Sequence, residues 1–244
     1  MCVLLELNQE KVLYAYVYFI QGVLFMITLK KIWHNNKLFI LFIVLMSVFR
    51  SAVADWYTVP TGSMQPTITE GDRIIVNKMA YDLRLPFTQL SLMTTNEPKR
   101  GEIVVFESEA AENRLIKRMI GLPGDVIEMK NEVVYVNGRQ LNYRMTQQNA
   151  HQLFITEKID NILHHVRIDK DKSNQLSSFS QVTVPKDHYL VLGDNRRNSS
   201  DSRVYGFVPR HELKGKATAI AFSFDYDNYY LPRKNRFFKD IYSI

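Results

Sequence analysis

The chain carries the stretch Pro60-Thr61-Gly62-Ser63-Met64-Gln65-Pro66-Thr67 shortly after an apolar segment, and Leu115-Ile116-Lys117-Arg118 further along. A hydroxyl is a poor nucleophile at pH 7, so a neighbouring base must take its proton. A lysine can act as that base only if burial keeps its amine neutral. The two stretches therefore predict a serine nucleophile, Ser63, served by a lysine base, Lys117, against an apolar surface.

Length, charge and cysteine content limit the class of protein. The 244 residues suffice for one sizeable domain with an appendage, and the formal net charge is +6. The basic residues are spread along the chain without a nucleic-acid-binding motif, so lipid is the preferred partner and nucleic acid is not expected. The single cysteine, Cys2, excludes an internal disulfide and a cysteine-based zinc cluster. His164-His165 lacks the spacing of a zinc site, and we expect no metal and no cofactor.

The N-terminal part has the composition of a membrane anchor. We predict that residues 1–54 form a transmembrane hairpin, with spans at about 12–29 and 38–54. The basic loop 30–37 should lie in the cytoplasm by the positive-inside rule, which places everything after about Asp55 outside it. The alternatives are a cleavable signal peptide and a buried helical hairpin in a soluble protein. Acidic residues before the first run and the unbroken apolarity of the second argue against them.

After the hairpin, short runs rich in β-branched residues recur between turn residues, which is typical of antiparallel β-structure. The predicted strands are Arg73–Asn77, Glu102–Phe106, Leu115–Ile120, Val126–Met129, Val133–Val136, Val182–Val184, Tyr189–Leu192 and Ala217–Phe224. The predicted fold class is therefore mainly β, with an antiparallel β-rich extracytoplasmic catalytic domain over residues 55–244.

Two segments of this domain stand apart from the strand pattern. We predict an insertion at about 126–184, whose more polar part, Asn142 to Gln181, should have a small structure of its own. The C-terminal segment Tyr226–Ile244 alternates aromatic residues with Lys and Arg. That segment is interpreted either as a surface that contacts the membrane or as a final strand and tail packed on the core.

Five blocks in order make the chain resemble bacterial type I signal peptidases, the membrane-bound serine proteases that remove signal peptides from exported proteins. The blocks are Pro60 to Thr67, Gly71-Asp72-Arg73, Arg100 to Phe106, Ile116 to Asp125, and Gly193 to Pro209. The resemblance implies that Ser63 attacks the scissile carbonyl and that Lys117 is the general base. Lys117 would have to lose roughly three units from its reference pKa to be substantially neutral near pH 7.

The resemblance also implies supporting roles. Ser199 would orient the amine of Lys117, and the hydroxyl of Thr61 would join the Ser63 backbone N–H in an oxyanion hole. Structural ion pairs near the site are implied for Arg118, Asp194, Asp201 and Arg203. Two positions depart from the family pattern: Arg197 stands where an acid is usual, and Leu115 stands where many relatives have Tyr.

Substrate recognition follows from the same resemblance. An extended peptide would add as a strand between the segment 57–61 and the strand before Lys117, with small residues in an A-x-A-like pattern before the cut. The predicted substrate-binding residues are Tyr57, Val59, Pro60, Leu115 and Ile116. The expected partners are signal-peptide-bearing preproteins and the lipid bilayer, with a functional link to the export machinery. The expected location is the bacterial inner membrane, multi-pass, with the catalytic domain on the periplasmic side.

Several other functions are alternatives to signal-peptide removal. A Ser-His-Asp hydrolase would use His188 or His211, but no Gly-x-Ser-x-Gly motif occurs. A peptidase specialised for a conjugation pilin and a self-cleaving Ser-Lys peptidase of the repressor type share the chemistry. A membrane-tethered β-domain that only binds peptides is the non-enzyme alternative, and it predicts that Ser63 and Lys117 are dispensable.

Overall fold

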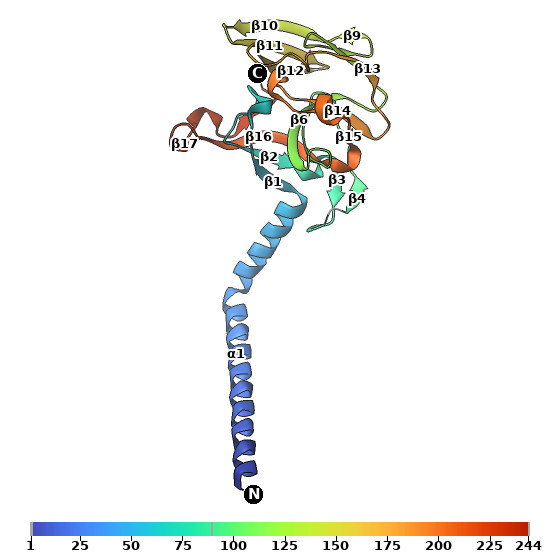
Figure 1. Cartoon of the computed structure of the whole chain (residues 1–244). Helices are drawn as coiled ribbons and strands as arrows, with labels where there is room; N and C mark the ends of the chain where they lie inside the picture. Colours follow the sequence, from blue (N-terminus) through green and yellow to red (C-terminus); the bar gives the residue numbers. More distant parts are fainter. Residues whose placement is uncertain (1, 89, 244) are drawn as a thin grey trace. The chain divides into compact units, whose positions relative to one another are not determined.

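The computed structural model describes residues 2–88 and 90–243, and its side chains are described from Tyr14 onward apart from Ala15. The chain divides into two compact units that meet between Phe49 and Arg50. The first unit is helical and the second is built almost entirely of β-strands (Figure 1).

The N-terminal segment is one continuous helix, α1 (Cys2–Ala52), and its part Tyr16–Ala52 is long and apolar enough to cross a membrane. The predicted hairpin with spans at about 12–29 and 38–54 is therefore wrong, because residues 30–37 are helical rather than a loop. Those eight residues contain neither Gly nor Pro, so nothing in them breaks the hydrogen-bond ladder. A multi-pass anchor is not supported.

The β unit contains one large antiparallel sheet and three small ones. The large sheet has the strand order β1-β2-β16-β5-β6-β14-β15, and β17 and β18 pair with β16. Its strands are β1 (Ala54–Thr58), β2 (Asp72–Asn77), β5 (Ile103–Ser108), β6 (Asn113–Gly121), β14 (His188–Leu192), β15 (Val208–Pro209), β16 (Leu213–Asp225), β17 (Leu231–Pro232) and β18 (Lys239–Asp240). The mainly antiparallel β-fold predicted from the sequence is confirmed.

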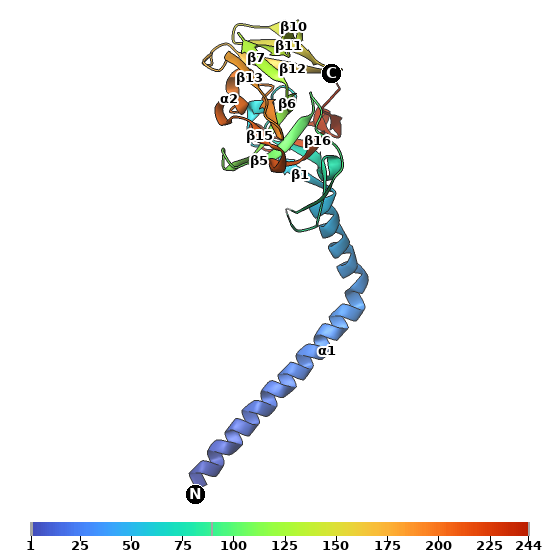
Figure 2. The same cartoon turned by 90° about the vertical axis from the view of Figure 1, so that its right-hand side faces the viewer.

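The small sheets lie on the periphery of the large one. They comprise β3 (Asp82–Arg84) with β4 (Ser91–Thr94); β7 (Val126–Lys130), β8 (Val133–Val136), β9 (Arg139–Gln140) and β13 (Phe179–Thr183); and β10 (Asn142–Gln148), β11 (Gln152–Ile159) and β12 (Ile162–Asp169). The sheet β10-β11-β12 lies at the end of the domain away from β1 (Figures 1 and 2). Short helices η1 (Gly62–Met64), η2 (Lys78–Ala80), η3 (Arg196–Asn198), α2 (Ser202–Tyr205), η4 (Arg210–Glu212) and η5 (Lys234–Arg236) connect the strands.

Each predicted strand overlaps an observed one, and β8 has the predicted bounds Val133–Val136. The polar segment Asn142 to Gln181 contains the three strands β10, β11 and β12, which the sequence analysis did not resolve. That this region is an insertion stays a prediction. The C-terminal segment follows the tail interpretation, because β17 and β18 both pair with β16.

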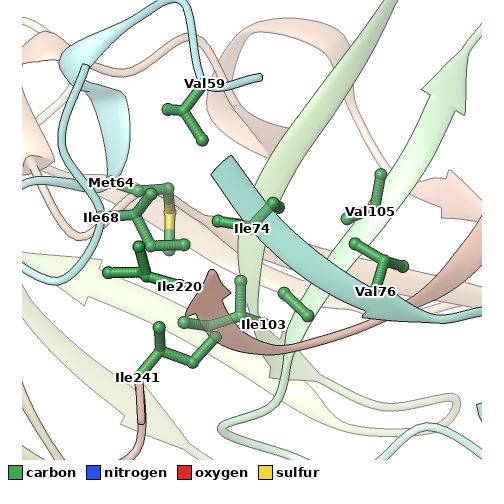
Figure 3. Close-up of a cluster of buried hydrophobic side chains, with 10 residues drawn as sticks. Val59, Met64, Ile68, Ile74, Val76, Ile103, Val105, Ile220 and Ile241 are labelled. Carbon is green, nitrogen blue, oxygen red and sulfur yellow. The ribbon is translucent and has the colours of Figure 1, made fainter. Parts of the chain in front are cut away.

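Two buried apolar clusters pack on the two faces of the large sheet, and one of them contains residues next to Ser63. Alternation along β5 sends Ile103 and Val105 into one buried cluster and Val104 and Phe106 into another on the opposite face. The first cluster also contains Val59, Met64, Ile68, Ile74, Val76, Ala217, Ile220 and Ile241 (Figure 3). The segment that carries Ser63 is therefore anchored to the sheet by its own apolar residues.

Candidate active site

Ser63 lies in the single turn of η1, between the buried residues Gly62 and Met64. Thr61 before the turn is exposed, whereas the side chain of Met64 is 1% exposed and packs in the core beside Ile68. Burial of these two apolar side chains stabilises the loop by roughly 2 kcal/mol for each residue. The loop thus cannot shift along the sheet, and the half-buried Ser63 faces the neighbouring strand β6.

Lys117 lies on β6, opposite Val104 of β5. Its Nζ lies 2.9 Å from Ser63 Oγ and also donates to the backbone carbonyl of Ile116 at 3.0 Å. The residue is 2% exposed, so the amine is held out of water with the serine hydroxyl as its side-chain partner. This is the distance at which a general base can take the hydroxyl proton.

Burial lowers the pKa of Lys117 from 10.5 to about 8. The carboxylates of Asp201 and Asp194 act in the opposite direction, while Arg203 adds to the lowering. At pH 7 about a tenth of the lysine is therefore neutral. The direction agrees with the sequence expectation, and the physical cause, removal from water, is the expected one.

The segment after β14 is hydrogen-bonded to η1, the turn that contains Ser63. Asn195 donates from its backbone N–H to the carbonyl of Ser63 at 3.0 Å and from Nδ2 to the carbonyl of Gly62 at 3.1 Å. A Cβ at Gly193 would lie 2.2 Å from Ser199 Oγ and 2.6 Å from the carbonyl oxygen of Ser63. Only glycine lets the strand approach this closely.

The four charged residues predicted to form ion pairs do so in two pairs. Arg118 binds Asp194 through Nε and Nη2 at 2.8 and 2.6 Å, and Arg203 binds Asp201 in the same two-pronged way. Burial opposes ionisation of both aspartates, but their arginines outweigh it and hold the pKa of each carboxyl below its ordinary value. Both acids thus stay charged beside the site.

The two supporting hydroxyls are placed differently from each other. Ser199 is buried and donates to Asp201 Oδ2 at 2.8 Å. Within the described residues, no hydrogen bond joins Ser199 to Lys117. Thr61 is exposed beside the nucleophile, and its hydroxyl does not cap the turn that follows. Their assigned roles stay predictions.

Arg197, the departure from the family pattern, has a partner of its own. Its Nε lies 2.8 Å from Oε1 of Glu132, in the turn between β7 and β8. The adjacent Arg196 is buried and pairs with Glu157 of β11 at 2.6 Å. These two acids were missed in the sequence analysis, and no local pattern there links them to the block that they contact.

The predicted substrate-binding residues flank two strand edges. Among the described residues, β1 pairs only with β2, and the part of β6 before Arg118 pairs only with β5, so each has one edge outside the ladder. The Arg114 guanidinium lies 4.3 Å from the centre of the Tyr57 ring and links the two strands. The substrate-binding residues differ in exposure: Pro60 is exposed, Tyr57, Leu115 and Ile116 are half-buried, and Val59 is a core residue.

A metal could be considered at one place. Ligand atoms of Glu109, His211 and Glu212 lie within 4.8 Å of one another, and two of the three residues are exposed. An acidic group of this kind is ordinary on a protein surface, and it shares no residue with the Ser63 and Lys117 pair. We assign it no chemistry.

The chain is similar in sequence to proteins of one family. The family model described as signal peptidase, peptidase S26, matches residues 32–222. A signal peptidase I of Pseudomonas aeruginosa is 36% identical over 197 residues, which cover 74% of this chain and 68% of that protein. Signal peptidase I P of Bacillus subtilis subsp. natto is 33% identical over 78% of this chain and 88% of its own length. A crystal structure of a signal peptidase I from Enterococcus faecalis V583 is 30% identical and covers 50% of this chain and 97% of its own, with a TM-score of 0.33.

The family match and the relatives identify the protein as a serine endopeptidase. The chain belongs to the signal peptidase family, peptidase S26.

Proposed function

We propose that the protein removes N-terminal signal peptides from exported preproteins, with Ser63 as nucleophile and Lys117 as general base. The observation that carries this proposal is the 2.9 Å contact between Lys117 Nζ and Ser63 Oγ, made by a lysine that is 2% exposed. Family membership supplies the substrate class, and the geometry supplies the pair of groups that the chemistry needs.

In the first step the neutral amine of Lys117 takes the Ser63 proton as Oγ attacks the scissile carbonyl carbon. The carbonyl π-bond breaks, and its electron pair moves to the oxygen, which the backbone N–H of Ser63 and the hydroxyl of Thr61 would stabilise. Lys117 becomes an ammonium ion. Asp201 and Asp194 favour its charged form, so the acids that raise its pKa also stabilise this intermediate state.

The second step releases the mature protein. The ammonium of Lys117 returns its proton to the leaving amine as the carbon–nitrogen bond breaks, which leaves an ester on Ser63 Oγ. Water then attacks the ester carbonyl carbon as Lys117 takes its proton. The bond from that carbon to Ser63 Oγ breaks, the signal peptide leaves with a new carboxyl group, and the ammonium of Lys117 returns the proton to Oγ. Ser199 would act indirectly, through its hydrogen bond to Asp201.

The substrate would bind as an added strand. The unpaired edges of β1 and β6 offer main-chain donors and acceptors on either side of an extended peptide. Tyr57, Pro60, Leu115 and Ile116 would contact its side chains, and Val59 would support them from the core. We propose cleavage after small residues in an A-x-A-like pattern, which is the kind of site that secretory signal peptides carry.

The apolar helix would anchor the enzyme in the bacterial cytoplasmic membrane, with the β unit on the periplasmic side. Preproteins delivered by the export machinery would then meet the site at high effective concentration, because both reactants are held in one bilayer. Alkaline extraction of membranes tests the anchor: the full chain should stay with the membrane fraction.

The chemistry is tested with Ser63→Ala and Lys117→Met in the detergent-solubilised full chain, with a preprotein as substrate and mass spectrometry to locate the cut. Each variant should lose at least about a thousandfold in kcat/KM, because neither group can act without the other. Lys172→Met, an exposed lysine changed in the same way, is the matched control and should retain full activity. Turnover retained in both site variants would contradict the Ser63 and Lys117 mechanism.

A further inference from the structure

The sheet β10-β11-β12 has a polar, hollowed face on the side away from its buried ion pairs, and we call it the outer face. It carries a cavity of about 460 Å³ that is lined by residues of all three strands. Residues directly opposite each other in the ladder point to the same face of a sheet. The pairing therefore aligns lining side chains in two rows: Arg144, Thr156 and His165 in one, and Asn142, Lys158 and Leu163 in the other.

Two cations of the outer face have no carboxylate partner. Arg144 and Lys158 are exposed, and no ion pair joins either of them to another residue in the described part of the chain. No acid is among the described residues that line the cavity. Thr156 Oγ1 lies 2.8 Å from Thr146 Oγ1 and 3.2 Å from His165 Nδ1, so hydrogen-bonding side chains lie beside the cations. A concave site lined by charge of one sign concentrates groups of the opposite sign.

The acids of the same sheet do not neutralise these cations. Glu157 points to the opposite face of β11, because it alternates with Thr156 and Lys158. Three acids occur in residues 142–169, and each lies against an arginine outside the two rows. The pairs are Glu157 with Arg196 at 2.6 Å, Asp160 with Arg100 at 3.3 Å and Asp169 with Arg167 at 2.7 Å.

The outer face continues to the serine turn through Arg167. This residue lies on β12 two positions after His165, so alternation places it on the same face. Its guanidinium donates a hydrogen bond to the side-chain carbonyl of Gln65, which is two residues after Ser63. A peptide that leaves the nucleophile past Gln65 therefore meets β12.

We propose that the outer face binds the segment of the preprotein that follows the cut, and that it favours acidic side chains there. The contacts proposed for residues before the cut lie between β1 and β6, so residues after the cut leave that groove at Ser63. Gln65 and Arg167 connect this end of the groove to the outer face. The inference rests on the proposed function, because a cleaved preprotein is what brings such a segment to this position.

The reach of an extended chain defines which residues would be bound. A strand advances about 3.3 Å per residue, so along β12 His165 lies about 7 Å and Leu163 about 13 Å beyond Arg167. The favoured acids are therefore those roughly three to eight residues after the cut. Their carboxylates would pair with Arg144 and Lys158.

The test compares three peptides that share one signal-peptide cut and differ only at the fourth to seventh residues after it, which are all Asp, all Asn or all Lys. The detergent-solubilised full chain should cleave the Asp peptide with a kcat/KM about fivefold above that of the Asn peptide, because exposed charge pairs contribute modestly. The Lys peptide should be cleaved more slowly than both. At about 1 M salt the three values should converge, since the charges are screened.

Three variants connect the preference to the outer face. Arg144→Gln/Lys158→Gln should bring the ratio of the Asp to the Asn peptide close to one, and Arg144→Glu/Lys158→Glu should reverse the preference towards the Lys peptide. A misfolded enzyme could not gain activity on the Lys peptide, so this reversal separates the site from folding. Lys130→Gln/Lys186→Gln removes two exposed lysines outside the outer face and should keep the fivefold ratio.

The failure of this inference differs from the failure of the proposed function. Equal kcat/KM values for the three peptides would overturn the inference and leave the peptidase activity established. The same holds for a ratio that Arg144→Gln/Lys158→Gln leaves unchanged, or that Lys130→Gln/Lys186→Gln abolishes as well. Absence of cleavage of all three peptides would overturn the proposed function and this inference with it.

Discussion

As the proposed general base, Lys117 has to be buried and yet remain basic, and its surroundings meet both requirements. Burial depresses its pKa, while Asp194 and Asp201 prevent the depression from going further. A lower pKa would give more neutral amine but a weaker base, so an intermediate value suits proton transfer near neutral pH. The placement of these acids by their arginines is therefore part of the proposed mechanism.

The pKa of about 8 predicts the pH profile. Because the neutral amine is the active form, kcat/KM should rise with pH to a plateau, with a midpoint near pH 8 and a fall of about tenfold per unit below it. The measurement uses a peptide substrate without groups that titrate in this range. Asp201→Asn removes a charge that raises the pKa, so its midpoint should lie at lower pH. A flat acidic limb, or a midpoint unmoved in that variant, would count against Lys117 as the base.

How much of the site could be predicted depends on the range of the contacts. Ser63 and Lys117 were found because each lies in a recognisable block, and the pairs Arg118 with Asp194 and Arg203 with Asp201 were expected near them. The Glu132 partner of Arg197 was missed, because the pairing depends on how a distant turn packs and leaves no local trace in the sequence.

At the scale of elements, local patterns predicted strands well and helix boundaries poorly. Alternation and turn residues located five of the nine strands of the large sheet, β2, β5, β6, β14 and β16, because each of these runs is apolar and bounded. The short strands β15, β17 and β18 and the edge strand β1 were missed. The hairpin prediction failed at residues 30–37, where a polar patch suggested a loop although its backbone has no helix breaker. Polarity alone does not end a helix. Helices end at Gly or Pro, or where side chains cap the unpaired backbone groups of the last turn.

The pair Arg197 and Glu132 joins η3, beside the active site, to the turn between β7 and β8. Both side chains are largely buried, so Arg197→Glu should lower the free energy of unfolding by about 2 kcal/mol through an unpaired, repelled carboxylate. The swap Arg197→Glu/Glu132→Arg should recover most of that loss. The measurement is urea unfolding, analysed as a double-mutant cycle.

The pair of exposed Lys130 and half-buried Glu128, at 2.9 Å, is the matched control. Its coupling energy should be under about 0.5 kcal/mol, since water screens exposed charges. If the swap at Arg197 and Glu132 recovers no stability, the contact does not hold η3 in place.

At the scale of the whole molecule, buried ion pairs connect the active-site block to the sheet β10-β11-β12. Glu157 of β11 pairs with Arg196, and its Oε1 lies 3.1 Å from Nε2 of the buried His164. The backbone N–H of Arg167 in β12 donates to the carbonyl of Asp194 at 2.8 Å. The small sheet is therefore part of the support for the site, although its sequence gave little indication of regular structure.

These pairs make the domain sensitive to acid. Asp194, Asp201 and Glu157 have folded-state pKa values below the ordinary 3.8 and 4.5, because their arginines outweigh the effect of burial. At pH values between the folded and unfolded pKa the unfolded chain binds more protons, so stability rises with pH there. The contribution of these three carboxylates to the free energy of unfolding should be nearly constant above about pH 5 and fall steeply below about pH 4. Urea unfolding across pH, followed by circular dichroism, measures this.

The variant Asp194→Asn distinguishes the loss of stability caused by acid from a loss of stability at all pH values. Without that carboxylate Arg118 is buried unpaired, so the variant should be less stable at pH 7 by about 3 kcal/mol. It also lacks one of the groups that take up protons on unfolding, so its acid slope should be shallower by up to about 1.4 kcal/mol per pH unit. The variant could instead be destabilised at pH 7 while its free energy of unfolding depends on acid pH as steeply as that of wild type. That result would show that Asp194 does not cause the pH dependence, which would then be assigned to Asp201 and Glu157.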